Sequence, residues 1–224
     1  MQARDRVVVA IDRSERDEIL RLVDVLAGSV GVFKIGLQAF IANGPSIVRE
    51  VVARGEKVFL DLKIHDIPNT ASHAIDEVAS LGAFMTTVHA AGGPAMLQAC
   101  ARPELLVLAV TVLTSLDEAD LMAIGFDRPP LSSAVRLAQL AQRRGLRGVV
   151  ASPLEIEAIR VACGDDFTIL TPGIRPAGSD RGDQRRTMSP ADAVSAGATY
   201  IVIGRPITDA PNPRDAAHAI IDSL

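Results

Sequence analysis

The sequence contains few cysteines and few aromatic residues, and it has no tryptophan. Its two cysteines, Cys100 and Cys163, are far apart. They lack the paired spacing of a zinc site or a redox motif, and they are too few for a disulfide framework. Because a chain without disulfides fits a reducing compartment, we expect the protein to be cytoplasmic.

Long hydrophobic runs and a strong excess of one charge are also missing. The apolar run at residues 7–11 is too short for a membrane span and too close to the N-terminus for a signal peptide. The formal net charge of -4 leaves no broad basic surface for a nucleic-acid backbone. We therefore expect neither a membrane nor a nucleic acid as a partner, and an anionic ligand must be bound by local groups.

Short β-branched runs alternate with amphipathic stretches along the whole chain, which is typical of βα units that build a parallel sheet. Eight strands are predicted, at residues 7–12, 32–35, 58–63, 84–89, 105–111, 148–151, 168–171 and 200–203. Eight units in 224 residues favour an α/β fold, a single (β/α)8 TIM barrel that forms one catalytic domain over residues 1–224. A doubly wound open sheet is the alternative, but residues 11–14 hold no glycine for a dinucleotide loop.

Cap and turn residues agree with this division. Ser14 and Asp17 have the spacing of a capping box, and Asn212 before Pro213 is typical of a helix start. Glycines lie where helices should end, at positions 28, 55, 82, 145, 164 and 197. Two connections, residues 113–132 and 173–189, are unusually long and are candidate lids.

Charged residues gather at the ends of the first three predicted strands. Asp12 ends the first strand, Lys34 lies near the end of the second, and Asp61 and Lys63 end the third, with Asp66 shortly after. Alternate residues of a strand share a face, so Asp61 and Lys63 should both point into the barrel mouth. A structural ion pair is the alternative, because buried charges need partners whatever their role. The number of such groups at one end of the barrel favours catalysis.

A second group of residues indicates a phosphate site. Gly204 and Arg205 follow the eighth strand, where barrels of this type often bind phosphate through backbone N–H groups and a guanidinium. Arg175 and Gln184, in the long connection before that strand, add a second guanidinium and an amide on a segment that could close over a ligand. A plain turn with a solvated arginine is the alternative.

Signals for a metal site or a nucleophile are weak. The four histidines, at positions 65, 73, 89 and 218, do not have the spacing of a metal site. No Ser/His/Asp or Cys/His triad can be assembled with confidence. We therefore expect no metal ion and no nucleophilic catalysis.

Residues 61–70, which read Asp-Leu-Lys-Ile-His-Asp-Ile-Pro-Asn-Thr, closely resemble the signature of the orotidine 5'-monophosphate decarboxylase family. Other segments resemble that family's motifs in the same order, at residues 10–12, 33–36, 113–115, 171–175, 182–184 and 204–207. The resemblance therefore covers essentially the whole chain. Related sugar-phosphate decarboxylases and synthases carry a similar Asp-x-Lys-x-x-Asp pattern, but they have an acidic magnesium ligand near the end of strand two, where this chain has Lys34.

The resemblance implies a homodimeric enzyme that decarboxylates orotidine 5'-monophosphate to uridine 5'-monophosphate in de novo pyrimidine biosynthesis, without metal or cofactor. Its catalytic residues would be Lys63, the proton donor, with Lys34, Asp61 and Asp66. Its substrate-binding residues would be Asp12, Lys34, Asp61, Ile67, Thr70, Thr114, Pro172, Arg175, Gln184, Gly204 and Arg205. Asp66 and Thr70 would reach the site of the neighbouring subunit.

Two other functions stay open. One is a magnesium-dependent decarboxylase or aldolase acting on a keto-sugar phosphate, which a chelator would inactivate. The other is a nucleotide-binding protein without catalysis. The intact set of Asp61, Lys63 and Asp66 argues against the second.

Overall fold

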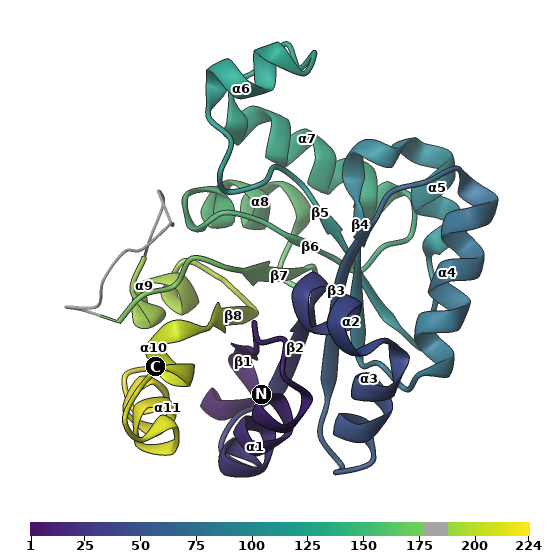
Figure 1. Ribbon diagram of the computed structural model, residues 1–224. Coiled ribbons are helices and arrows are strands. Elements are labelled where there is room, and N and C mark those ends of the chain that lie inside the picture. The colour runs from purple at the N-terminus through teal and green to yellow at the C-terminus, as the bar shows by residue number, and fades with distance from the viewer. Residues whose placement is uncertain (177–187) are drawn as a thin grey trace.

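The computed structural model describes residues 1–176 and 188–224, and the described residues form a closed barrel of eight parallel strands in sequence order (Figure 1). The strands are β1 (Val7–Ala10), β2 (Val32–Gly36), β3 (Val58–Ile64), β4 (Met85–His89), β5 (Leu106–Val110), β6 (Gly148–Val150), β7 (Thr168–Thr171) and β8 (Tyr200–Ile203). Every predicted strand is present, and the bounds of β7 and β8 are as predicted. The prediction of an α/β TIM barrel is confirmed.

Helices surround the barrel and separate its strands along the chain (Figure 1). They are α1 (Arg16–Leu26), α2 (Leu37–Asn43), α3 (Pro45–Val52), α4 (Pro68–Ser80), α5 (Gly93–Cys100), α6 (Glu118–Ala123), α7 (Pro130–Arg143), α8 (Ile156–Cys163), α9 (Pro190–Ser195), α10 (Arg205–Thr208) and α11 (Pro213–Ile221), with short 3-10 turns η1 (Ala3–Arg6), η2 (Ala90–Gly92) and η3 (Pro153–Glu155). The first and last long helices, α1 and α11, are in contact, which closes the ring. Within the described part of the chain, no helix is long and apolar enough to cross a membrane.

The helix boundaries confirm most of the predicted caps. All six glycines expected at helix ends have positive φ, a conformation that costs little without a Cβ atom. Asn212 caps α11 by accepting a hydrogen bond from the backbone N–H of Asp215. The capping box of Ser14 was wrong, because Glu15 is the N-cap of α1 and makes no side-chain cap bond. The Ser14 hydroxyl instead accepts a hydrogen bond from the side-chain amide of Gln38 on α2, so a tertiary contact replaces the local one.

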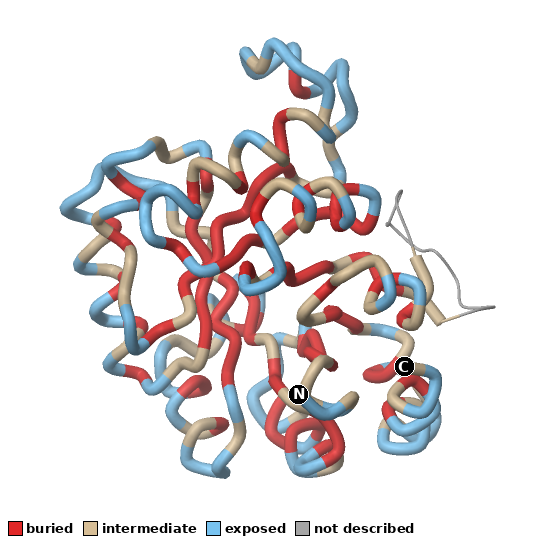
Figure 2. Tube along the Cα trace, turned by 180° about the vertical axis from the view of Figure 1, so that it is seen from behind, coloured by how far each residue is buried: buried red, intermediate tan, exposed pale blue. Residues whose placement is uncertain are grey.

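Two apolar clusters hold the fold together. The larger lies between the strands and the helices, and Figure 2 shows the buried strands at the centre with the outer helix faces exposed. The smaller, which we call the barrel floor, fills the inside of the barrel with Val8, Ala10, Val32, Phe59, Met85, Leu108, Leu170 and Val202. Because these side chains close the lower part of the barrel, the space that remains inside the described part of the barrel lies at the C-terminal ends of the strands.

The third strand carries an irregularity where it reaches this end. Leu60 pairs with Thr86 of β4, but the next pairing joins Ile64 to Val88, so β3 contains two more residues than β4 between the two pairings. Within this bulge Lys63 has a φ of 52°, and among the described residues it is the one non-glycine residue with positive φ. A bulge re-aims the side chains that it contains.

Candidate active site

A cavity of about 450 Å³ opens at the C-terminal ends of the strands. It is lined by residues from β1, β2, β3, β5, β6, β7 and β8 or from the loops that follow them. The structure brings nine of the residues expected at the site together in its wall: Asp12, Lys34, Asp61, Lys63, Thr114, Pro172, Arg175, Gly204 and Arg205. Side chains distant in sequence therefore meet where the barrel topology predicts.

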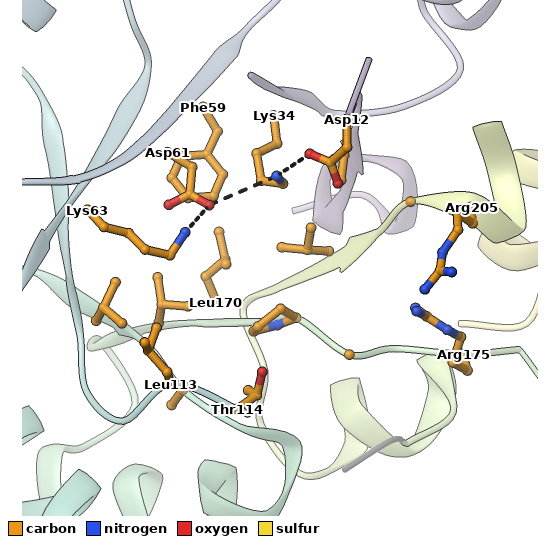
Figure 3. A pocket seen from close by; sticks show the side chains of 18 of the residues that line it. Asp12, Lys34, Phe59, Asp61, Lys63, Leu113, Thr114, Leu170, Arg175 and Arg205 are labelled. Carbon is orange, nitrogen blue, oxygen red and sulfur yellow. Dashed lines mark hydrogen bonds and ion pairs between the residues drawn. The ribbon is translucent and has the colours of Figure 1, made fainter. Parts of the chain in front are cut away.

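Four charged side chains form a chain across one side of the cavity (Figure 3). The Lys34 ammonium lies 3.0 Å from Asp12 Oδ1 and 4.0 Å from Asp61 Oδ2. The Lys63 ammonium lies 2.8 Å from the same Asp61 oxygen. Positive and negative groups alternate across the four residues, so Lys34 and Asp61, the two most enclosed, each have neighbours of opposite charge.

Asp61 is the most enclosed of these four charged residues, with a relative exposure of 9%. Its Oδ2 atom forms ion pairs with Lys34 and Lys63, and its Oδ1 atom accepts a hydrogen bond of 2.9 Å from the hydroxyl of Thr87. Phe59, two residues earlier on β3, faces the same way and belongs to the barrel floor. The alternation predicted for positions 59, 61 and 63 is therefore confirmed, whereas nothing in the sequence had drawn attention to Thr87.

The opposite side of the cavity carries two guanidinium groups. Figure 3 shows Arg175, from the loop after β7, and Arg205, from the start of α10, next to each other and away from Lys63. The loop that holds Arg175 begins with a bridge between Ile174 and Met188, and the backbone N–H of Arg175 donates to the Met188 carbonyl. Two cations side by side create a local preference for an anion.

A further arginine, Arg13, lines the same cavity and was not predicted. Its guanidinium donates to Glu18 at 2.7 Å and pairs with Asp209, and these hydrogen bonds raise its pKa. Because both carboxylates already neutralise Arg13, we assign Arg13 a structural role in the cavity wall and no role in ligand binding.

Three of the expected site residues lie outside this cavity. Asp66, Ile67 and Thr70 are at or just before the start of α4, where all three are exposed. The Asp66 carboxylate accepts a hydrogen bond of 2.7 Å from the backbone N–H of Ile67. Gln184 and most of the candidate lid at residues 173–189 lie outside the described residues.

Two histidines stand beside the charged chain. The rings of His65 and His89 are 5.5 Å apart. Burial lowers the pKa of His89, electrostatic interactions with His65 and Lys63 lower it further, and Asp61 opposes them. Among residues 1–176 and 188–224, no group of three or more His, Cys, Asp or Glu side chains is arranged to hold a metal ion.

The two cysteines are free and buried. Burial raises the pKa of the Cys100 thiol to about 11 and raises that of Cys163 as well. A thiol that stays protonated at neutral pH is a poor nucleophile. Neither cysteine lines the cavity.

A (β/α)8 barrel whose mouth joins an alternating chain of lysines and aspartates to a pair of arginines defines an enzyme that acts on small anionic molecules. Comparison with known proteins makes this class specific. Residues 5–220 match the model of the orotidine 5'-phosphate decarboxylase / HUMPS family, and the chain belongs to that family.

Curated relatives share about half of the sequence over nearly the full chain. The orotidine 5'-phosphate decarboxylase of Moorella thermoacetica is 53% identical, covering 98% of this chain and 92% of its own. That of Paramagnetospirillum magneticum is 50% identical, covering 96% of each. Among solved structures, the orotidine 5'-phosphate decarboxylase of Lactobacillus acidophilus superposes with a TM-score of 0.86 at 34% identity, covering 97% of both chains.

Proposed function

We propose that this protein, acting as one catalytic domain, decarboxylates orotidine 5'-monophosphate to uridine 5'-monophosphate and CO2 in de novo pyrimidine biosynthesis. The observation that carries the proposal is the position of Lys63, whose ammonium lies 2.8 Å from Asp61 inside the cavity. The identity to curated orotidine 5'-phosphate decarboxylases supports the choice of substrate.

The chemical problem is the electron pair left on C6 when the bond to the carboxylate breaks. The ring offers little delocalisation for this pair, so the barrier is high, and no cofactor is proposed to accept the electrons. An ammonium group beside C6 stabilises the developing negative charge and then transfers a proton to the carbon. We assign this role to Lys63, which regains its proton from solvent after the product leaves.

Asp61 and Lys34 act on Lys63 through charge. Asp61 orients the ammonium, and Lys34, 4.0 Å from Asp61, offsets part of the negative charge of Asp61. A substrate carboxylate next to Asp61 would be repelled by about 4 kcal/mol at 4 Å and an effective dielectric near 20. We rank stabilisation of the transition state above this repulsion, because the ammonium acts where charge develops.

The remaining residues that line the cavity bind the nucleotide in this proposal. Asp12 and Lys34, which are paired at 3.0 Å, hold the ribose. Thr114 and Pro172 contact the pyrimidine, and Arg175, Gly204 and Arg205 hold the phosphate. Gln184, outside the described residues, would bridge base and phosphate. Binding energy from the distant phosphate can then order the charged chain around the reacting carbon.

We also propose a homodimer in which Asp66, Ile67 and Thr70 enter the partner's cavity. All three are exposed, and Ile67 shows 67% of its surface although it is apolar. In a two-fold dimer, the same surface of each subunit can complete the other's site. A cytoplasmic location is part of the same proposal, since both thiols stay free.

Mixing two inactive variants tests the shared site. Lys63→Ala and Asp66→Ala each damage every site of their own homodimer. A mixed dimer has one site with both residues intact, so exchange of subunits should restore about a quarter of the wild-type activity. No recovery, with co-purification of two differently tagged variants showing that mixed dimers form, would contradict the sharing of Asp66.

The activity itself is tested by adding orotidine 5'-monophosphate to the purified protein in chelator and following the ultraviolet change as uridine 5'-monophosphate forms. Turnover that survives the chelator supports the proposal. Turnover that needs added magnesium favours the lyase or aldolase acting on a keto-sugar phosphate. Tight binding of the nucleotide without turnover favours the non-catalytic binding protein.

A further inference from the structure

The hydroxyl of Thr87 lies at the irregularity between β3 and β4. Because Leu60 pairs with Thr86 and Ile64 pairs with Val88, the intervening residues of β3 face Thr87 alone. Thr87 is fully buried, and its neighbour Met85 belongs to the barrel floor. Since alternate residues share a face, the Thr87 side chain points to the inside of the barrel.

The Thr87 hydroxyl makes two hydrogen bonds. It donates to Asp61 Oδ1 at 2.9 Å, and it accepts from the backbone N–H of Lys63 at 2.9 Å. The other oxygen of Asp61 accepts from the Lys63 ammonium at 2.8 Å. One hydroxyl therefore connects the backbone of Lys63 to the carboxylate that holds the end of the same lysine.

The backbone of Lys63 needs such support. Its φ of 52° lies in the left-handed region, which is unfavourable for a residue with a Cβ atom and persists only where the surroundings fix it. The register shift also leaves the N–H of Lys63 without a strand partner on β4. The threonine hydroxyl takes the place of the missing carbonyl acceptor.

We propose that Thr87 is a positioning residue for the reaction. Its hydroxyl fixes both the backbone from which Lys63 extends and the rotation of the Asp61 carboxylate, so the ammonium is held at the reacting carbon. The inference rests on the function proposed above, because it takes Lys63 as the proton donor. Groups that orient a reacting side chain without touching substrate change the rate more than the binding.

Thr87→Val is the decisive variant, because valine keeps the shape of threonine and removes the hydroxyl. The chain offers a matched control in Thr86→Val. Thr86 is the adjacent residue of β4, is fully buried, and donates its hydroxyl to the Leu60 carbonyl at 2.7 Å. It does not line the cavity. The two variants each lose one buried hydroxyl from the same strand, and only one of them loses the contact to Asp61.

We expect Thr87→Val to lower kcat by roughly 10- to 100-fold while leaving the affinity for uridine 5'-monophosphate nearly unchanged. Thr86→Val should lose a similar amount of thermal stability and keep its kcat. Thr87→Ser, which retains the hydroxyl, should recover most of the turnover. If Thr87→Val is insoluble, Thr87→Ala against Thr87→Ser makes the same comparison, since these two variants differ only in the hydroxyl.

An equal loss of kcat in Thr86→Val and Thr87→Val would overturn the inference, and so would a serine variant as slow as the valine variant. Amide hydrogen exchange at Lys63 gives a test that needs no substrate. The exchange should be faster in Thr87→Val than in wild type or Thr86→Val, and equal rates would also overturn the inference. An inactive wild-type protein with the expected exchange pattern would defeat the proposed function alone.

Discussion

The barrel floor and the barrel mouth are built by the same strands but from opposite kinds of residue. On β3, Phe59 is buried in the floor, whereas Asp61 and Lys63, two and four residues further, belong to the charged chain. The floor has to fill a volume with apolar side chains. The mouth has to keep opposite charges paired beside a cavity. A distance of four residues along one strand thus separates the part that stabilises the fold from the part that performs the chemistry.

The largest effect should follow from Lys63→Ala in the mouth. Loss of both the proton donor and the cation beside C6 should lower kcat by roughly 10⁴-fold. The fold should persist, because Asp61 keeps Lys34 at 4.0 Å and the Thr87 hydroxyl. Steady-state turnover, with circular dichroism and binding of uridine 5'-monophosphate as controls, measures this. Near-normal turnover would remove Lys63 from the role of proton donor.

The matching substitution in the floor is Leu108→Ala. Leu108 is fully buried in the floor and does not line the cavity, so this substitution should reduce the free energy of unfolding by about 2 to 5 kcal/mol. The kcat of the folded protein should change little. Urea unfolding and kinetics on the same preparation measure both quantities. A large loss of kcat at unchanged stability would erase the distinction between floor and mouth.

Arg205→Ala removes a cation on the other side of the mouth. Arg205 lies across the cavity from Lys63 (Figure 3), and removing its guanidinium should lower kcat/KM on orotidine 5'-monophosphate by roughly 10²-fold through lost contacts to phosphate. With orotidine, which has no phosphate, the variant and the wild type should be nearly equal. Equal losses on both substrates would show that Arg205 does not act through the phosphate.

The smallest effect concerns His89, at the end of β4 beside the mouth. Its pKa is lowered, first by burial and then by His65 and Lys63, so below its ordinary value of 6.5 the unfolded chain binds a proton that the folded chain does not. Stability should therefore fall as the pH decreases from about 6.5 towards the lower folded pKa. His89→Gln should flatten this dependence in urea unfolding measured at several pH values, and parallel curves for the two proteins would contradict the assignment.

The fold could be predicted from the sequence because the patterns that indicate its strands and helix ends are local. The strands are short runs rich in apolar and β-branched residues, and the glycines at helix ends have the positive φ that their positions require. The capping box at Ser14 failed because its hydroxyl contacts Gln38, 24 residues away. A local pattern cannot report a partner that only the folded chain brings near.

The site could be predicted from the sequence for a different reason. Parallel strands meet at one edge, so charges at their ends predict a cluster, and Lys34, Asp61 and Lys63 form one. Thr87 could not be found this way, because a threonine in a strand is ordinary and its role depends on a register shift between β3 and β4. The roles of Asp66 and Thr70 stay predictions, since they concern a second subunit.

The filled floor also determines where a substrate can enter the barrel and where the products can leave it. Side chains from seven strands close the barrel from below, and Val8, Met85 and Leu108 within it are 0% exposed. Among the described residues these side chains block the axis of the barrel, so in the proposed reaction the nucleotide and the CO2 would both pass through the mouth. In that reaction the CO2 would leave either past the bound nucleotide or after it, through the same mouth at which Arg175 and Arg205 lie.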